Sequence, residues 1–202
     1  MSFFYSGNDD DPRQAARRPM LAFVLVTLAI GAGASVFTEP SIPTWYAALV
    51  HPAITPPNWV FAPVWTTLYV VMAVAAWRVW RVTGMQPSPA REALAAGSGS
   101  RPSGPDAVAG SRASEGRRGL INIEMAAYAI QLAFNFAWSW IFFSLHRIGA
   151  ALAEILALDV AILVTTILFF RRDRIAGLLF LPYLAWSSFA SLLTYEIWTL
   201  NP

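Results

Sequence analysis

Residues 45–69 read WYAALVHPAITPPNWVFAPVWTTLY, and this stretch decides the fold. It is rich in tryptophan and repeatedly interrupted by proline. Because proline fixes φ and has no backbone N–H, residues 52–57 cannot form a regular helix and should be a stiff, extended connection. The apolar sequence that follows is helical in character. The stretch therefore indicates a rigid aromatic loop that leads into a membrane-spanning helix.

The composition of the whole chain supports a membrane location. The 202 residues are 56% hydrophobic and 13% charged, which is too apolar for an ordinary soluble domain. We therefore expect an integral membrane protein surrounded by the lipid bilayer. The sequence has 0 cysteines, which excludes disulfides, thiolate metal sites and a cysteine nucleophile. The net charge of +2 comes without a basic aromatic patch, so nucleic acid is not an expected partner.

Apolar segments long enough to cross a bilayer occur along the rest of the chain. Residues 1–19 should form a polar tail, and residues 20–202 should form one membrane domain. The expected spans are about 20–37, 59–77, 125–145, 148–170 and 175–200. Short links make the last three antiparallel neighbours. The predicted fold is an all-α membrane protein, a bundle of five transmembrane helices.

Two segments depart from this plain pattern. The first span could instead be a signal peptide, because Arg17 and Arg18 precede its apolar core and residues 32–34 fit a small-residue cleavage site. Residues 83–119 are rich in glycine, serine, proline and arginine and contain few large apolar side chains. Such a composition cannot bury enough surface to order itself, so a disordered loop is expected to interrupt the membrane domain.

Ordered sequence blocks on several spans resemble a known family. The blocks are W-Y-x-x-L-x-x-P and P-P-x-W-V-F-x-P-V-W-T-x-L-Y, then QLAFNFAW at residues 131–138, IFF at 141–143 and PYLAW at 182–186. Together they resemble the translocator protein family, the tryptophan-rich sensory proteins or peripheral benzodiazepine receptors (TspO/MBR). The resemblance covers residues 20–82 and 120–201. It implies a five-helix protein that binds porphyrins and other lipophilic molecules and forms a homodimer.

The resemblance also implies a set of ligand-binding residues on the loop and the helices. Those matching the family's pocket or its drug contacts are Tyr46, Trp65, Asn135, Ala153, Trp186, Ala190 and Leu193. Helical spacing adds Phe61, on the face of Trp65, and Trp138, on the face of Asn135. Indole rings offer flat surfaces to a planar ligand such as a porphyrin. Gln131 shares the face of Asn135, and either a ligand contact or a bond between helices is open for it.

Other polar residues give no clear catalytic or metal site. Glu154 and Asp159 lie within a span, where a charge is costly and suggests a function. We expect Asp159 to hydrogen-bond within the bundle and leave the role of Glu154 open. His51 and His146 fall in connections and are expected to be surface residues, not haem ligands. No metal site and no required cofactor are predicted.

The leading functional hypothesis is a membrane receptor or sensor for porphyrins and similar lipophilic ligands. The alternatives are a transporter of tetrapyrroles or sterols and a light- or oxygen-dependent enzyme that degrades porphyrin. In the enzyme, the candidate catalytic residues would be Trp65 and Trp186, because no acid–base or nucleophile constellation is present. Sterol binding has the least support, because no arginine or lysine follows Leu193 and Tyr195 as the cholesterol-recognition pattern requires.

Charge and small residues predict orientation and assembly. With five spans, every arginine except Arg147 falls on the side of the N-terminal tail, the loop 83–119 and the link between the last two spans. The positive-inside rule then places the N-terminus and this loop in the cytoplasm of a bacterium with the protein in its plasma membrane. Gly31, Gly33 and Ser35 would permit the close helix contact of a dimer.

Overall fold

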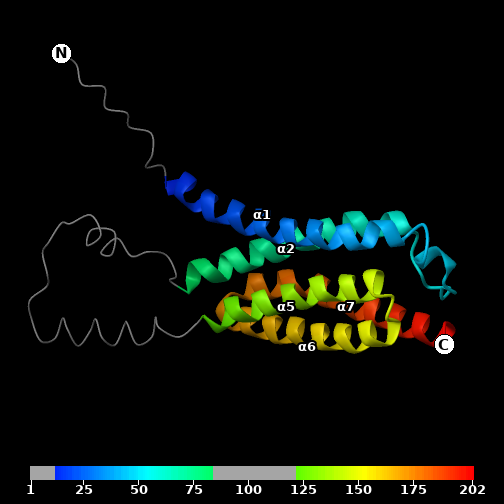
Figure 1. Cartoon of the computed structure of the whole chain (residues 1–202). Coiled ribbons are helices and arrows are strands. Elements are labelled where there is room, and N and C mark those ends of the chain that lie inside the picture. Colours follow the sequence, from blue (N-terminus) through cyan, green and yellow to red (C-terminus); the bar gives the residue numbers. More distant parts are fainter. Residues whose placement is uncertain (1–11, 84–121) are drawn as a thin grey trace, which may run out of the picture.

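The computed structural model describes residues 12–83 and 122–202, with side chains from Arg18 onward. These residues form long helices and short connections (Figure 1). The helices are α1 (Pro12–Thr38), α2 (Phe61–Val82), α5 (Ile123–Ser139), α6 (Ile148–Arg172) and α7 (Arg174–Leu200). The described residues include 5 helices long and apolar enough to cross a membrane, and they contain no strand. The predicted five-helix membrane bundle is confirmed.

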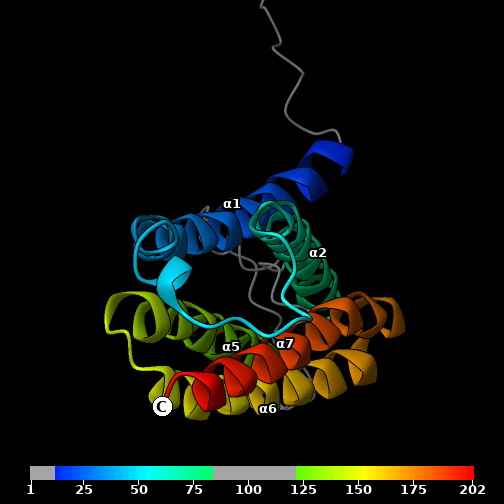
Figure 2. The ribbon, with the colours of Figure 1, turned by 90° about the vertical axis from the view of Figure 1, so that its right-hand side faces the viewer.

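The helices close into a ring. α1 packs against α2, α2 against α7, α7 against α6, α6 against α5, and α5 returns to α1. Figure 2 shows this arrangement, with the connection between α1 and α2 crossing one end of the ring. Side chains of α2, α5 and α7 meet in its interior. The centre of the ring is therefore the place where residues from distant spans come together.

Two ends of the ring are distinguished by their connections. At one end, Arg78 of α2 pairs with Asp173 at 2.8 Å, and Arg172 pairs with Glu124 of α5. The opposite end carries the aromatic loop and the C-terminus (Figure 1). The start of α1 and the bounds of the segment 84–121 thus share one end, as the arginine distribution predicted. Which end faces the cytoplasm stays a prediction.

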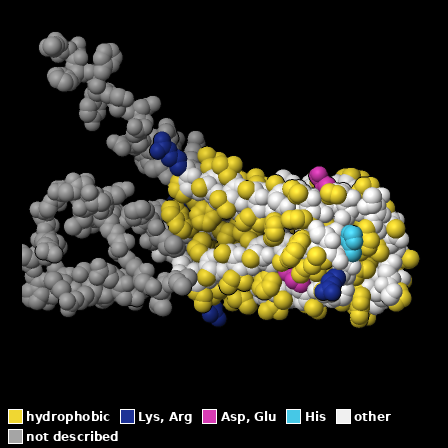
Figure 3. Space-filling view, viewed as in Figure 1, with side chains coloured by type: hydrophobic (Ala, Val, Ile, Leu, Met, Phe, Trp, Pro, Cys, Tyr) yellow, Lys and Arg dark blue, Asp and Glu magenta, His cyan; other side chains and the backbone are white. Residues whose placement is uncertain are grey.

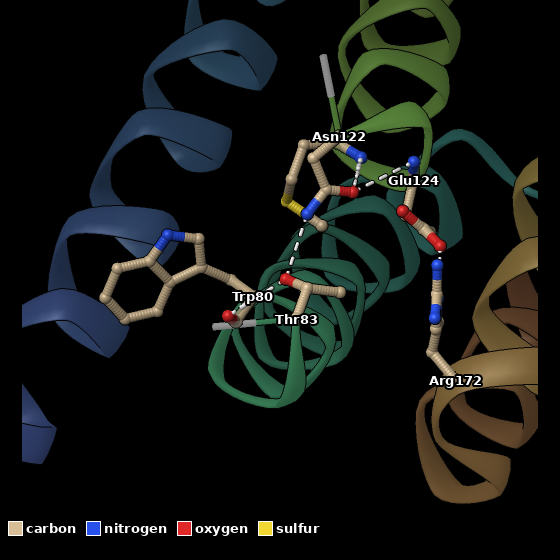
Figure 4. Close-up of polar contacts among 6 residues, drawn as sticks. Trp80, Thr83, Asn122, Glu124 and Arg172 are labelled. Atoms are coloured by element: carbon tan, nitrogen blue, oxygen red, sulfur yellow. Dashed lines mark hydrogen bonds and ion pairs between the residues drawn. The ribbon is translucent and has the colours of Figure 1, made fainter. Parts of the chain in front are cut away.

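Polar side chains begin two of the helices. The side-chain oxygen of Asn122 accepts hydrogen bonds from the backbone N–H groups of Glu124 at 3.1 Å and Met125 at 3.4 Å. The Asn122 amide also donates to Thr83 Oγ1 at 2.9 Å, which joins the end of α2 to the start of α5 (Figure 4). Asp173 caps α7 by accepting from Ile175 N at 2.8 Å. These caps satisfy N–H groups that the helices leave free.

The start of α1 differs from the prediction. The helix begins at Pro12, inside the segment expected to be a polar tail, and it contains Pro19. The apolar run begins at residue 20, whereas the helix also includes the more polar residues before it. The candidate span is Arg18–Ser41. The rest of the predicted tail and almost all of the predicted loop 83–119 lie outside the described residues.

The glycines of α1 pack inside the protomer. A Cβ on Gly31 would lie 2.3 Å from Cε2 of Tyr69, and one on Gly33 would lie 3.3 Å from Cε2 of Phe136. Ser35 donates to the carbonyl of Ala32 in its own helix at 2.8 Å. Both glycines therefore bring α1 close to its own neighbours, α2 and α5, which the sequence argument had assigned to a second copy. The dimer stays a prediction, without the glycines as its support.

Candidate functional site

A polar bridge crosses the centre of the ring. Tyr69 of α2 donates its hydroxyl proton to Asn135 Oδ1 at 2.6 Å, and Asn135 Nδ2 donates to the Tyr183 hydroxyl of α7 at 3.0 Å. All three side chains are buried. The single amide of Asn135 thus links three helices, and the bridge fixes the positions of the groups around it.

One tryptophan stands next to each member of the bridge, on the side of the aromatic loop. Trp65 precedes Tyr69 by one turn of α2, and its ring centroid lies 5.7 Å from that of Tyr69 and 6.2 Å from that of Tyr183. Trp138 follows Asn135 by about one turn of α5, and Trp186 follows Tyr183 likewise on α7. Three helices therefore each contribute an indole to the same level of the ring.

Two of these indoles have unused hydrogen-bond donors. Nε1 of Trp138 and Nε1 of Trp186 are buried, and neither has a hydrogen-bond partner among the described residues. An indole N–H can only donate, and a buried donor left unpaired costs about 1–3 kcal/mol. The hydroxyl of Ser187, beside Trp186, is also buried without a partner there. This level of the ring thus offers donors to a molecule that carries acceptor groups.

Gln131 lies on the other side of the bridge, one turn of α5 before Asn135. It is 0% exposed, and neither its amide oxygen nor its amide nitrogen finds a partner in the part of the chain that the structure describes. The hydrogen bond between helices, one of the two sequence interpretations, is therefore not formed. A ligand contact remains open for this residue.

The aromatic loop is fastened over the end of the ring. Ser41 Oγ donates to the carbonyl of Phe143 at 2.6 Å, and Val50 N donates to Asn201 Oδ1 at 2.9 Å. Tyr46 lies between these anchors, 5.8 Å from the ring of Phe143. Burial raises the pKa of Tyr46 above its ordinary value of 10.0, so the phenol stays neutral. The loop thus holds a buried, uncharged Tyr46 near the site.

The end of α5 changes helical geometry under this loop. Trp140–Ser144 form a π-helix, which often occurs at functional sites. Phe142 lies in it, and its ring stacks on Trp138 at 5.2 Å. His146 follows with φ 53 and stacks on Trp45 at 4.2 Å. The π-helix therefore links the Trp138 level of the ring to the aromatic loop.

The remaining predicted residues are distributed unevenly. The ring of Phe61 lies 5.9 Å from Trp186, and Ala190 packs against the main core. Leu193 is buried on α7. Ala153 is exposed on α6, and the structure does not bring it to the others. The resemblance to the family, and not helical spacing, had assigned Ala153 to this set.

The sequence interpretation missed two residues of the bridge, Tyr69 and Tyr183. A signal existed for both, because Tyr69 is one turn from Trp65 and Tyr183 one turn from Trp186. Neither was selected, because a tyrosine on a helix face is equally typical of core packing. Only the hydrogen bonds to Asn135 distinguish them.

The two acids of α6 behave differently from each other. Asp159 Oδ2 accepts a hydrogen bond from Ser191 of α7 at 2.6 Å, which confirms the predicted bonding within the bundle. Both carboxylate oxygens of Glu154 are buried without a hydrogen-bond partner in residues 12–83 and 122–202. The role of Glu154 stays open.

A cavity of about 740 Å³ lies in a different place, between α1, α2 and α5. It is lined by Phe23, Thr27, Trp80, Tyr128 and neighbouring apolar side chains, and none of the predicted ligand-binding residues is among them. The cavity is therefore distinct from the tryptophan site.

Comparison with known proteins gives a consistent result. The sequence profile of the TspO/MBR family matches residues 23–199. The chain is 34% identical over 182 residues to "Tryptophan-rich protein TspO" of Archaeoglobus fulgidus, covering 90% of this chain and 96% of that protein. It is 33% identical over 179 residues to "Tryptophan-rich sensory protein" of Cereibacter sphaeroides, covering 89% and 90%. It is 31% identical over 157 residues to the human "Translocator protein", covering 78% and 75%.

Proposed function

Because the chain belongs to the TspO/MBR family, we propose that it is a receptor or sensor that binds porphyrins and similar lipophilic ligands inside its helix ring. It is an integral membrane protein, so such ligands reach it from the bilayer or through its ends. Porphyrin is proposed as a ligand and not as a required cofactor.

One observation carries the proposal. Trp65, Trp138 and Trp186 stand at one level on three helices, and two of them present unpaired N–H groups. A porphyrin has a flat aromatic face and carboxylate side chains. The face matches stacking on indole rings, and the carboxylates are strong acceptors for the free donors. The bridge of Tyr69, Asn135 and Tyr183 lies beside them, and the ring of Trp65 packs against both tyrosines.

Transport and porphyrin degradation are the two alternative functions that the test must distinguish. One similar protein is named a sensory protein and another a translocator protein, so transport is considered beside sensing. Five spans do not divide into two equal inverted repeats, which disfavours a common transporter design. Porphyrin degradation would use Trp65 and Trp186 as redox-active side chains. Sterol binding has no further support.

Orientation and assembly belong to the same proposal. For a bacterial plasma membrane, we place the N-terminus and the loop 83–119 on the cytoplasmic side, because the arginines gather on the side of these segments. A homodimer is expected by analogy with the family. Protease access in oriented vesicles and crosslinking in native membranes measure the two properties.

The binding test uses porphyrin titration of the protein in nanodiscs, read by quenching of tryptophan fluorescence. Trp65→Phe and Trp186→Phe should each weaken saturable binding by up to about fivefold, because the smaller ring keeps only part of a stack that contributes on the order of 1 kcal/mol. Trp186→Phe and Trp138→Phe also remove an unpaired indole N–H, whereas the N–H of Trp65 is not among the unpaired donors. Trp140→Phe is the matched control, because Trp140 is 46% exposed. Trp80 is unsuitable as a control, because it lines the separate cavity.

Product analysis under illumination separates the functional classes. Intact porphyrin at saturation supports a receptor, and turnover of many equivalents supports an enzyme. Light-driven loss that disappears in Trp65→Phe would assign the redox role to that side chain. Unchanged saturable binding in the Trp65→Phe, Trp186→Phe double variant would show that the pocket is elsewhere.

A further inference from the structure

The hydroxyl of Ser187 differs from the other buried hydroxyls of serine and threonine. Ser187 is 1% exposed, and its Oγ has no hydrogen-bond partner among the described residues. The other buried serines and threonines each donate to an oxygen of the chain: Thr27, Thr165, Thr166, Ser191 and Thr194. A helical serine or threonine commonly bonds to the carbonyl one turn earlier, as Thr194 does, but Ser187 does not. The Ser187 hydroxyl therefore remains unused in the folded chain.

The residues one turn away on either side show where Ser187 lies. Tyr183, four residues before it, accepts the hydrogen bond from Asn135 of α5 at 3.0 Å. Ser191, four residues after it, donates to Asp159 of α6 at 2.6 Å. Residues four apart share a face of a helix, so Ser187 lies on the stripe of α7 that runs from the centre of the ring toward α6. Ser187 thus belongs to the interior of the ring, on the loop side of the polar bridge.

Trp186 adds a second unused donor in a neighbouring direction. Consecutive residues of a helix are about 100° apart, and the ring of Trp186 lies 5.9 Å from that of Phe61 on α2. Its Nε1 is buried without a partner in the part of the chain that the structure describes. An indole N–H can only donate, and a hydroxyl can donate as well. α7 alone therefore supplies two adjacent donors at the tryptophan level.

The surroundings of the molecule cannot supply the acceptor for Ser187. Figure 3 shows hydrophobic side chains over much of the described surface, and Ser187 is buried beneath such a surface. Asp159 bonds to Ser191 and makes no hydrogen bond to Ser187. A molecule that satisfies this hydroxyl has to enter the ring and to present an acceptor there. A carbonyl oxygen, in a carboxylate or in an ester, accepts from a hydroxyl.

We propose that Ser187 is a specificity-determining residue of the porphyrin site and donates to a carbonyl oxygen at the edge of the ligand. The inference rests on the proposed function and names the ligand class within it. Porphyrins whose side chains carry carboxylate or ester groups pair with the hydroxyl. Porphyrins with hydrocarbon side chains alone leave it unpaired, so they bind more weakly.

The test titrates protoporphyrin IX, its dimethyl ester and etioporphyrin, which has only alkyl side chains, into the protein in nanodiscs, read by quenching of tryptophan fluorescence. Ser187→Ala should weaken binding of the free acid by about tenfold and of the ester by about fivefold, because a hydrogen bond to a charged acceptor is stronger. Binding of etioporphyrin should not change. Ser188→Ala is the matched control, because Ser188 is exposed on the same helix.

Thermal unfolding without ligand separates binding from a structural role. Ser187→Ala removes a buried hydroxyl that has no partner, so Tm should stay unchanged or rise. Ser191→Ala leaves Asp159 Oδ2 unpaired and should lower Tm. A fall in Tm of the same size in Ser187→Ala would assign the hydroxyl to a bond within the bundle and overturn the proposal.

The binding data distinguish failure of this inference from failure of the proposed function. Saturable binding that Ser187→Ala leaves unchanged, or weakens equally for all three porphyrins, would refute the role of Ser187 alone. Absence of saturable binding of any of the three porphyrins to the wild type would refute the porphyrin site and this inference together.

Discussion

Replacing Gly31 with alanine should pull apart the polar bridge at the centre of the ring. The new Cβ would lie 2.3 Å from Cε2 of Tyr69, 2.6 Å from Cδ2 and 2.9 Å from Cζ. Carbon atoms pack at about 3.5 Å, so the tyrosine ring must move by roughly 1 Å. The Tyr69 hydroxyl lies 2.6 Å from Asn135 Oδ1, and a movement of that size takes it beyond hydrogen-bond distance.

The expected cost combines three terms. Overpacking of a core contributes about 1–3 kcal/mol, and the lost hydrogen bond about 0.5–1.5 kcal/mol. Alanine is a better helix former than glycine, which offsets about 1 kcal/mol. The net loss for Gly31→Ala is then about 0.5–3.5 kcal/mol of unfolding free energy. For a chain of this size it corresponds to a fall in Tm of about 1–14 °C.

Thermal unfolding in detergent, followed by far-ultraviolet circular dichroism, measures the effect. Gly33→Ala is the matched control, because its Cβ would meet only Phe136 at 3.3 Å. In a Tyr69→Leu background the ring is absent, so the loss caused by Gly31→Ala should disappear. An equal loss in that background, or none in the wild type, would refute the clash with Tyr69.

Two further substitutions test the opposite end of the ring. Arg172→Ala should lower the unfolding free energy by about 1–3 kcal/mol, because it leaves the buried carboxylate of Glu124 unpaired. Arg171→Ala, the control, should change it by less than about 0.5 kcal/mol. Equal Tm values for the two variants would show that the ion pair does not stabilise the protein. Replacing residues 84–121 with a short glycine–serine linker should leave Tm unchanged or raise it. Thr83 and Asn122, which flank the segment, are hydrogen-bonded at 2.9 Å, and a shorter loop costs less entropy to close. A chain that no longer folds would show that the segment contributes to the stability of the bundle.

Most of the fold was predictable because it depends on one-dimensional signals. Apolar length predicted the spans, and the prolines of residues 52–57 predicted a connection without regular helix, which the structure confirms. The connection is not extended throughout, because Ala53 and Ile54 form a turn that a hydrogen bond from Thr55 N to the Pro52 carbonyl closes at 3.0 Å. The start of α1 was not predictable in this way. Hydropathy reports where a segment becomes apolar, and a helix that continues past the membrane surface at Pro12 leaves no such signal.

The sequence predicted which helix faces carry the site, but not which side chains of different helices contact each other. Periodicity places Trp65, Trp138 and Trp186 on inward faces, but it does not say which side chains from different helices meet. Tyr69 and Tyr183 were missed for this reason. Ala153 was assigned by the family resemblance, and in the structure it is exposed on α6. The glycines of α1 show the same limit, because small residues permit close contact but do not determine which helix is the neighbour.

α5 has two faces of different chemical character. Its inward face carries Asn135 and Trp138, and its outward face lines the cavity between α1, α2 and α5 with Ala129 and Ala133. The inward face has a donor without a partner among the described residues, Nε1 of Trp138. In the cavity, by contrast, the Thr27 hydroxyl donates to the carbonyl of Phe23 and lies 2.7 Å from the Tyr128 hydroxyl. Polar groups that a ligand could use are therefore found on the inward face of α5, which is where the proposed porphyrin site lies.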